Sequence, residues 1–257
     1  MKCVILAGGK GTRIAEESNT RPKPMVEIGG RPMLWHIMKL YAAYGVCEFI
    51  VCLGYKGYMI KEYFANYFLH QADVTFDISG NRVEYHDSRS EPWKVTLVDT
   101  GEATMTGGRL RQVRGYLRPG EAFCMTYGDG LADIDVGAEI AFHRASGCRA
   151  TVACVPPPAR FGRIVARDAK VVSFAEKPQS DGGLINGGFF VLEAQVLDLI
   201  AGDDTVWEKE PMERLAAERQ LAAWIHRGFW QPMDTLRDKV TLNALWEGGA
   251  APWKVWR

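Results

Sequence analysis

"CVILAGGKGTR", residues 3–13, joins a short apolar run to a loop rich in glycine. Residues 3–7 show no polar alternation, which predicts a strand buried on both faces, as in a parallel sheet. Gly8, Gly9 and Gly11 then permit positive φ angles and a close approach of backbone N–H groups to a bulky ligand. A tight turn from strand to helix, without a ligand, is the alternative interpretation of these glycines.

Polar side chains in the same loop indicate that the ligand is an anion such as a nucleoside triphosphate. Lys10 and Arg13 are cations, Thr12 adds a hydroxyl donor, and a guanidinium can donate to two phosphate oxygens at once. The loop is not a Walker A motif, because Lys10 stands between glycines rather than after the last one. It is not a dinucleotide fingerprint either, since Ile14 occupies the position of the third glycine.

The next cation, Lys23, lies in the segment "RPKPM" at residues 21–25. Pro22 and Pro24 restrict the backbone on both sides of it, so its side chain leaves from a rigid platform. A lysine that neutralises phosphate charge benefits from such preorganisation, whereas a solvated surface lysine does not need it. We therefore expect Lys23 to be functional.

Composition and charge exclude several classes of protein. Of the 257 residues, 47% are hydrophobic and 24% charged, which is ordinary for a chain with a sizeable core. Lys plus Arg and Asp plus Glu each number 31, and a general binder of nucleic acid or anionic membranes would usually carry a basic excess. No signal peptide or stretch of 18 apolar residues is present, so the expected location is cytoplasmic.

Cysteine and histidine give little support to a metal site or a cysteine nucleophile. The six cysteines form no C-x-x-C pair, and most lie in or beside apolar runs, as buried residues of a reducing compartment do. The five histidines are scattered, without the spacing of a zinc site.

Strand-like runs alternate with helical patterns through the first part of the chain. An alternating hairpin pattern around Ser79-Gly80-Asn81 is the exception, at residues 74–86. The predicted strands are 3–7, 48–55, 94–100, 121–130 and 149–155, and the predicted helices are 32–45, 57–68, 107–117 and 135–147. Such alternation predicts an α/β fold with a mostly parallel central sheet and helices on both faces.

The second part of the chain has a different pattern. Residues 162–178 predict two short strands, and 184–192 predict another; helices are expected at 210–220 and 234–248. We therefore expect one domain over residues 1–257, with a nucleotide-binding α/β core at 1–155. Residues 156–257 would form an antiparallel-rich C-terminal extension for sugar-phosphate binding and oligomerisation.

Six motifs, in order, resemble the sugar-1-phosphate nucleotidylyltransferase family. They are "LAGGKGTR" (6–13), "PKPM" (22–25), "YGDG" (127–130), "FAEKP" (174–178), "INGGFFVL" (185–192) and "FWQPMDTLRD" (229–238). The wording around 91–110, 127–135 and 228–246 is most similar to the glucose-1-phosphate cytidylyltransferases of that family. The resemblance covers nearly the whole chain and implies a Rossmann-like nucleotidyltransferase fold.

The resemblance also implies a reaction and its setting. CTP and α-D-glucose 1-phosphate would give CDP-glucose and pyrophosphate, with Mg²⁺ as cofactor and no nucleic-acid or membrane partner. The product would serve CDP-deoxysugar and surface polysaccharide (O-antigen, lipopolysaccharide) biosynthesis. The resemblance implies a homo-oligomer, with a hexamer as one form of assembly. Nucleotidyl transfer needs cations, backbone donors and a metal rather than a Ser/His/Asp triad, because the sugar phosphate is already ionised.

Site residues follow from the resemblance, motif by motif. Arg13, Lys23 and Asp129 would be catalytic, and Asp129 and Asp234 would hold Mg²⁺. Lys23, Glu176, Lys177 and Asn186 would bind the sugar phosphate. The implied nucleotide contacts are Leu6, Ala7, Gly8, Gly9, Lys10, Gly11, Thr12, Arg13, Thr104, Arg109 and Gly128.

Structural alternatives exist for several of these residues. Asp129 follows an apolar strand and could be a turn residue at the surface, although ligands of α/β sheets collect at such strand ends. Asp234 could cap the helix that follows it. Glu176 and Lys177 could be a solvated strand end. The tryptophans near the C-terminus are expected in packing or subunit contacts rather than in base stacking.

Two alternative functions remain at the level of sequence. The chain could be a uridylyl- or thymidylyltransferase acting on the same or another sugar 1-phosphate, because no residue can be assigned to cytosine selection from the pattern. It could also be a catalytically silent protein that binds nucleotide sugars. The presence of both aspartates, Asp129 and Asp234, argues against a silent protein, since binding alone does not require a two-carboxylate metal site.

Overall fold

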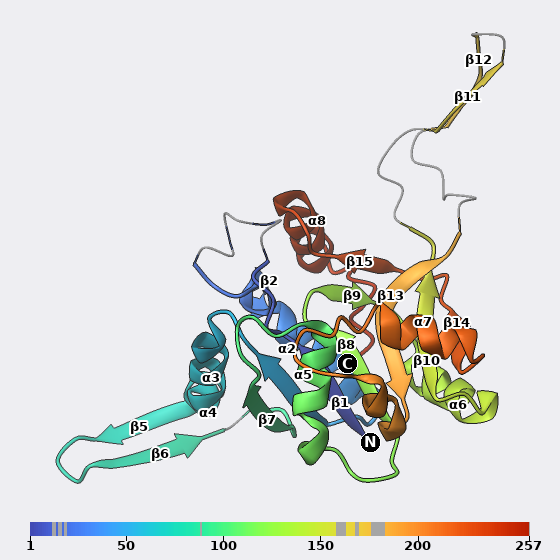
Figure 1. Ribbon diagram of the computed structural model, residues 1–257. Helices are drawn as coiled ribbons and strands as arrows, with labels where there is room; N and C mark the ends of the chain where they lie inside the picture. Colours follow the sequence, from blue (N-terminus) through green and yellow to red (C-terminus); the bar gives the residue numbers. More distant parts are fainter. Residues whose placement is uncertain are drawn as a thin grey trace.

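The first strand, β1 (Lys2–Leu6), lies inside a seven-stranded sheet in the computed structural model of the chain (Figure 1). The structure describes residues 1–11, 14, 17, 20–87, 89–157, 163–167, 170–175 and 183–256, with backbone alone for 163–167 and 170–175. The other strands of the sheet are β4 (Glu48–Leu53), β7 (Lys94–Asp99), β8 (Phe123–Tyr127), β10 (Ala150–Val155), β13 (Ile185–Leu192) and β14 (Leu221–Ile225).

The strand order is β14-β10-β13-β8-β1-β4-β7. β13 runs antiparallel to β8 and β10, whereas the other neighbouring strands pair in parallel. The predicted mostly parallel sheet is confirmed. The antiparallel strands expected of the C-terminal part are also present. One of them, β13, is inserted between β8 and β10, so the later residues complete the sheet that the earlier ones begin.

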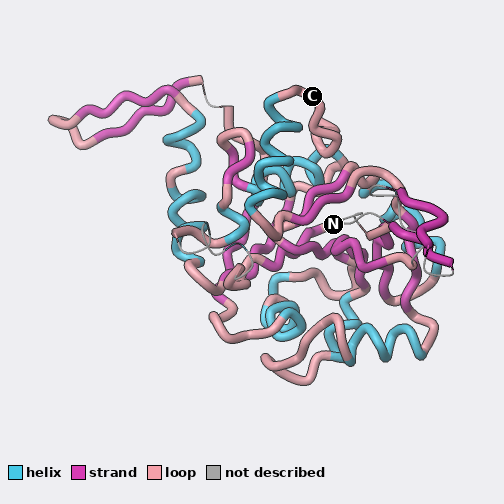
Figure 2. Tube along the Cα trace, turned by 90° about the horizontal axis from the view of Figure 1, so that it is seen from above, coloured by secondary structure: helices cyan, strands magenta, loops and turns pink. Residues whose placement is uncertain are grey.

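Helices cover both faces of the sheet, as expected (Figure 2). One face packs against α2 (Met33–Ala43), α3 (Gly57–Ala65) and α6 (Val136–Ser146), and the other against α5 (Thr106–Gln112) and α7 (Glu210–Ala217). Successive residues of β1 enter opposite cores, because side chains alternate across a strand. Cys3 and Ile5 belong to the first core and Val4 and Leu6 to the second, and the four are 0–8% exposed.

The remaining elements are short or peripheral. They are η2 (Lys23–Met25), β2 (Glu27–Ile28), β3 (Arg31–Pro32), α4 (Tyr67–Gln71), β5 (Asp73–Asp77), β6 (Arg82–His86), η3 (Arg114–Tyr116), β9 (Gly130–Ala132), β11 (Arg163–Arg167), β12 (Lys170–Ala175), η4 (Ala194–Leu199), β15 (Trp230–Pro232) and α8 (Leu236–Glu247). β5 and β6 form the predicted antiparallel hairpin, as do β11 and β12. In the described residues, no helix is long and apolar enough to cross a membrane.

Two features of the sheet region were not predicted. β14, with the sequence "LAAWI", pairs in parallel with β10 at one end of the sheet, and its alanines give a weak strand signal. β15 pairs with β9 in a small antiparallel ribbon, with Pro232 opposite Gly130. This ribbon brings together two chain segments about a hundred residues apart, and it determines the geometry of the site.

The tryptophans near the C-terminus pack within the chain itself. Trp253 is fully buried, stacks on Trp246 with ring centroids 6.4 Å apart, and donates from Nε1 to Nδ1 of His36 over 3.3 Å. His36 is buried on α2, and its Nε2 bonds the carbonyl of Ile28 over 2.8 Å. The packing interpretation is confirmed for Trp246 and Trp253, and the last segment of the chain is anchored to α2.

Candidate functional site

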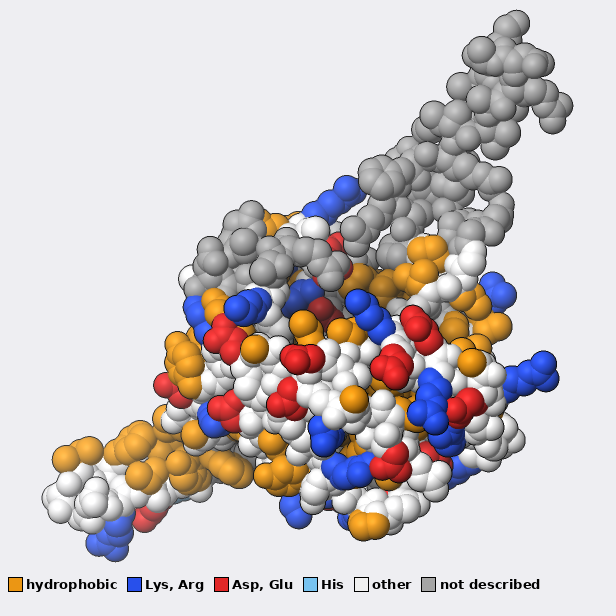
Figure 3. Space-filling view, in the orientation of Figure 1, with side chains coloured by type: hydrophobic (Ala, Val, Ile, Leu, Met, Phe, Trp, Pro, Cys, Tyr) orange, Lys and Arg blue, Asp and Glu red, His pale blue; other side chains and the backbone are white. Residues whose placement is uncertain are grey.

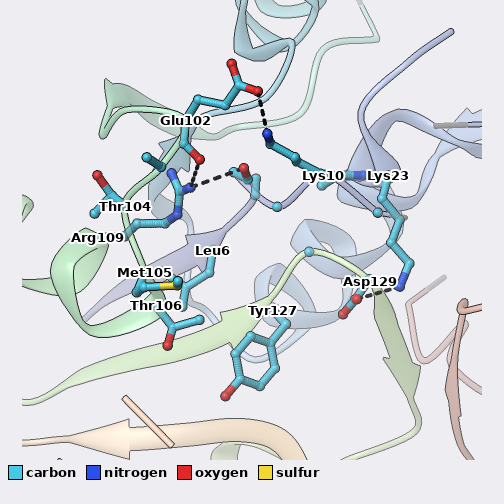
Figure 4. A pocket seen from close by; sticks show the side chains of 17 residues that line it. Leu6, Lys10, Lys23, Glu102, Thr104, Met105, Thr106, Arg109, Tyr127 and Asp129 are labelled. Atoms are coloured by element: carbon cyan, nitrogen blue, oxygen red, sulfur yellow. Dashed lines mark hydrogen bonds and ion pairs between the residues drawn. The ribbon is translucent and has the colours of Figure 1, made fainter. Parts of the chain in front are cut away.

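A cavity of about 490 Å³ opens where β1 and β8 end, at the carboxyl edge of the parallel sheet (Figure 4). Its lining comes from residues 6–11, 102–106 and 127–129, together with Lys23, Pro24 and Arg109. Parallel strands place their ligands at this edge, because the loops that leave the strands converge there. Of the expected nucleotide contacts, Leu6, Ala7, Gly8, Gly9, Lys10, Gly11, Thr104, Arg109 and Gly128 line the cavity.

The glycine loop is shaped by the protein as well as by any ligand. A Cβ added at Gly8 would overlap the guanidinium of Arg109, whereas a Cβ at Gly9 would meet no atom within 4 Å. Gly11 has a φ of +63°, which L side chains rarely adopt. The bulky group that Gly8 accommodates is therefore Arg109, and Gly9 is the glycine whose backbone borders open space.

Arg109 connects the loops on both sides of the cavity. Its Nη1 donates to the carbonyls of Leu53 and Gly101 over 2.9 Å each and to Oγ1 of Thr100 over 2.7 Å. Its Nη2 donates to the carbonyl of Gly8 over 3.2 Å. Arg109 is 5% exposed, and burial lowers the pKa of its guanidinium. The expectation of a direct nucleotide contact overlooked this internal role.

A surface ion pair spans the mouth of the cavity. Lys10 Nζ lies 3.2 Å from Oε1 of Glu102, and both side chains are more than half exposed (Figure 4). Such a pair contributes little to stability, because water and salt screen it. Lys10 is therefore able to exchange Glu102 for an anion in the cavity at small energetic cost.

Lys23, which lines the cavity together with Asp129, holds two carboxylates close to each other. Its Nζ lies 2.7 Å from Oδ2 of Asp129 and 2.7 Å from Oδ1 of Asp234, and the residue is 7% exposed. The backbone of residues 23–25 forms a 3-10 turn that starts with the bond from the Met25 N–H to the Pro22 carbonyl, over 2.8 Å. The rigid platform inferred from the two prolines is present.

The β9–β15 ribbon explains how the two aspartates meet. Asp129 immediately precedes β9, and Asp234 is the second residue after β15. The N–H of the intervening Met233 donates to the Asp129 carbonyl over 2.8 Å. The capping alternative for Asp234 is wrong: Thr235 is the N-cap of α8, in a capping box with Asp238. The carboxylate of Asp234 therefore does not cap the helix, and it accepts a bond from Lys23.

Two carboxylates that converge on one cationic atom fit a divalent metal ion. Hard divalent cations take one or two carboxylates together with phosphate oxygens and water. The described residues contain no group of three or more His, Cys, Asp or Glu that could form an all-protein metal cage. The donor set therefore fits a metal shared between protein and substrate rather than a structural ion.

A smaller pocket adjoins the cavity across Tyr127 and Asp129, which line both. Asn186 lines this second pocket, and its Oδ1 accepts a bond of 2.8 Å from the N–H of Gly188. Trp230 closes another side, donating from Nε1 to the Gly187 carbonyl over 2.6 Å. The structure thus brings Asn186 beside Asp129, as the sugar-phosphate expectation requires.

Other site residues were missed, and some expected ones cannot be assessed. Tyr127, Glu102, Met105 and Thr106 line the cavity without having been singled out. Tyr127 could have been noticed, because it starts the "YGDG" motif at the end of a buried strand. The expected residues Thr12, Arg13, Glu176 and Lys177 lie outside the described residues.

Comparison with known proteins identifies the family of the chain. The sequence profile of the family described as "Nucleotidyl transferase" matches residues 2–232. The chain belongs to this family. Nucleotidyl transferases generally use a divalent metal ion, in agreement with the paired carboxylates of Asp129 and Asp234.

Full-length relatives are similar to this nucleotidyl transferase. The glucose-1-phosphate cytidylyltransferase of Salmonella typhimurium is 61% identical over 256 residues, covering 100% of both chains. A Bacillus subtilis protein named "Probable glucose-1-phosphate cytidylyltransferase" is 46% identical over 257 residues, again covering 100% of both.

Solved structures of low sequence identity share the fold. HddC from Yersinia pseudotuberculosis has a TM-score of 0.66 at 22% identity, covering 95% of this chain and 99% of its own. A UDP-glucose pyrophosphorylase complexed with UDP-glucose has a TM-score of 0.67 at 14% identity, covering 96% and 98%. These likenesses confirm the expected nucleotidyltransferase fold.

Proposed function

We propose that this nucleotidyl transferase moves the cytidylyl group of CTP to α-D-glucose 1-phosphate, forming CDP-glucose and pyrophosphate. The observation that carries the chemistry is the Lys23 ammonium between Asp129 and Asp234, where Lys23 and Asp129 line the glycine-loop cavity. The choice of base and sugar is supported by the Salmonella typhimurium relative, which is 61% identical over its full length.

In the proposed reaction, a phosphate oxygen of glucose 1-phosphate attacks the α-phosphorus of CTP. A new phosphorus–oxygen bond forms, and the bond from the α-phosphorus to the bridging oxygen breaks. Pyrophosphate leaves with that electron pair. No general base is required, because the attacking oxygen is already ionised at neutral pH. The protein binds the two polyanions next to each other and stabilises the charge that develops in the transition state.

Each side chain has a role in this proposal. Backbone N–H groups of the glycine loop, with Lys10, Thr12 and Arg13, bind the triphosphate, and Thr104 and Arg109 lie on the side of the base. Lys23 neutralises charge where the two phosphates meet. Asn186, with Glu176 and Lys177, binds the sugar phosphate. Asp129 and Asp234 would hold Mg²⁺, which when bound neutralises phosphate charge and orients the reacting groups.

Pyrophosphate release tests the proposal. Purified protein would be given glucose 1-phosphate and Mg²⁺ with CTP, UTP, dTTP, ATP or GTP in separate reactions, and Asp129→Asn would serve as the inactive reference. Release with CTP well above the others is the expected result. Comparable release with UTP or dTTP would keep the chemistry and refute the base assignment. Tight nucleotide binding without release from any sugar 1-phosphate would refute the reaction.

The proposed assembly is a homo-oligomer, and the β5–β6 hairpin offers it a surface (Figure 3). Val74 pairs with Tyr85 and Phe76 with Val83, so these four side chains share one face of the hairpin. Phe76, Val83 and Tyr85 are 47–54% exposed, and Ile78 at the tip is 86% exposed. A second copy of the chain would cover this face. Light scattering checks the proposal: Phe76→Ser with Tyr85→Ser should lower the mass, and a monomeric wild-type protein would refute it.

The cellular setting is also proposed. All six cysteines are free thiols, which fits a reducing compartment such as the cytoplasm. CDP-glucose made there would supply the synthesis of deoxysugars for surface polysaccharide.

A further inference from the structure

The segment before α7 packs against the start of α5, behind Met105 and Thr106 of the cavity lining. The N–H of Met105 donates to the Asp203 carbonyl and that of Gly107 to the Thr205 carbonyl, each over 2.9 Å. A Cβ at Gly107 would lie 2.7 Å from the Thr205 carbonyl oxygen, so this backbone contact is tight. The segment is therefore fixed against residues 105–107, of which Met105 and Thr106 line the cavity.

Glu208 extends from this segment to two hydroxyl groups. Its Oε2 accepts a bond of 2.6 Å from Oγ1 of Thr106, and its Oε1 accepts a short bond from the hydroxyl of Tyr127. Thr106 Oγ1 also accepts from the N–H of Trp207 over 2.9 Å, and Trp207 is fully buried. The Glu208 backbone is thus anchored by its neighbour, and its carboxylate has both oxygens engaged.

Tyr127 is the residue that the two pockets share besides Asp129. Its ring meets that of Phe190 edge to face, with centroids 6.1 Å apart. On another side it leaves no room for a side chain at Gly188, where a Cβ would lie 2.7 Å from Cδ2 of the ring. Protein atoms therefore locate the ring, and Glu208 accepts the bond that the Tyr127 hydroxyl donates.

We propose that Glu208 is a positioning residue for the sugar 1-phosphate, because its bonds to Thr106 and Tyr127 hold the Tyr127 ring as the wall between the nucleotide cavity and the second pocket. This inference rests on the proposed function, which places the sugar phosphate in the pocket of Asn186. Without the carboxylate, the Tyr127 hydroxyl loses its acceptor, and the ring no longer defines the pocket edge. Binding of the acceptor then weakens, while binding of the nucleotide, on the other side of the wall, persists.

Steady-state kinetics of Glu208→Gln and Tyr127→Phe test the proposal. The glutamine keeps the size of the side chain but can accept only one of the two bonds. We expect each variant to raise the KM for glucose 1-phosphate about tenfold, as loss of a bond to a charged group does, with the KM for CTP changed less than about twofold. The double variant should be no worse than the more affected single variant, because both changes remove one interaction. Glu210→Gln, an exposed carboxylate two residues away, is the matched control.

Direct binding separates positioning from a merely structural role. Calorimetric titration with CDP-glucose and with CDP isolates the contribution of the sugar, and the thermal midpoint reports folding. The expected result is a selective loss of CDP-glucose affinity at an unchanged midpoint. Equal losses for CDP and CDP-glucose, additive effects in the double variant, or an unchanged acceptor KM would overturn the inference. A wild-type protein that makes no CDP-glucose would instead refute the proposed function.

Discussion

Lys23 Nζ lies 2.7 Å from Oδ1 of Asp234, although 211 residues separate them in the chain. The same ammonium is 2.7 Å from Oδ2 of Asp129. Lys23 and Asp234 are 7% and 8% exposed, so their charges meet where solvent screening is weak. This relationship makes Lys23 the counterion of both carboxylates. In the proposed function the same ammonium would neutralise charge where the two reacting phosphates meet.

Replacing Lys23 should abolish most of the turnover. We expect Lys23→Ala to lower kcat by at least about a hundredfold, as loss of a cation that stabilises the transition state does. Pyrophosphate release at saturating substrates is the measurement. Lys61→Ala, which removes an exposed lysine on α3, is the control. A Lys23→Ala enzyme with near wild-type turnover would refute the catalytic role.

A divalent metal ion should raise the thermal stability of the protein more when Lys23 is absent. In Lys23→Ala, Asp129 and Asp234 lose the cation between them and repel each other. A metal ion bound to the pair then stabilises the folded state more than it does in the wild type. We expect Mg²⁺ to raise the thermal midpoint of Lys23→Ala by more than that of the wild type. Adding Asp234→Asn should remove the difference. An equal response in both proteins would contradict the assignment of the pair as the metal site.

Adjacent glycines of the loop should behave differently when changed to alanine. A Cβ at Gly8 overlaps the Arg109 guanidinium and disturbs the bonds that join the loops, so Gly8→Ala should lower stability by about 1–3 kcal/mol. Gly9→Ala should leave stability within about 0.5 kcal/mol, because its Cβ would meet open space. Urea unfolding measures both. If Gly9 borders the triphosphate, as proposed, Gly9→Ala should still raise the KM for CTP.

Glu139 should make stability depend on pH. It is 1% exposed on α6, and in the described residues its Oε1 has no hydrogen-bond partner; burial raises its pKa to about 8. The folded state therefore keeps a proton that the unfolded state releases above the ordinary carboxyl pKa. As the pH rises from about 4.5 to about 8, the contribution of Glu139 to the free energy of unfolding should fall by up to about 1.4 kcal/mol per pH unit.

The variant Glu139→Gln tests this dependence, because it keeps the shape of the side chain and cannot ionise. We expect it to remove the part of the slope that Glu139 contributes between about pH 5 and 8, and to be more stable than the wild type at the alkaline end. Urea unfolding at several pH values is the measurement, with the exposed Glu247→Gln as control. Parallel curves for Glu139→Gln and wild type would show that Glu139 is not held neutral in the folded state.

Local patterns predicted most secondary structure correctly, because they depend on neighbours in the chain. The apolar run before Gly8 became the central strand β1, and the alternation around Ser79-Gly80-Asn81 became the β5–β6 hairpin. The position of β13 inside the sheet was not predictable from its own residues. The order of strands depends on which strands pair in three dimensions, and the residues "INGGFFVL" would predict a strand whatever its neighbours.

The residues of the candidate site likewise fall into those that the sequence indicated and those that it did not. Residue type and spacing indicated an anion-binding glycine loop, a braced Lys23 and an aspartate at the end of a buried strand, since each belongs to one continuous segment. Glu208 gave no signal, because its proposed role depends on hydroxyl groups of Thr106 and Tyr127 that are 102 and 81 residues away.

The sequence by itself determined the alternation of strands and helices, the glycine loop and the family to which the chain belongs, because these are written in contiguous residues. Tertiary structure alone decided that Arg109 fills the space beside Gly8, that Thr235 rather than Asp234 caps α8, and that the β9–β15 ribbon joins Asp129 to Asp234. The physical reason is that a site made of side chains from distant segments exists only after the backbone has brought them within hydrogen-bonding distance.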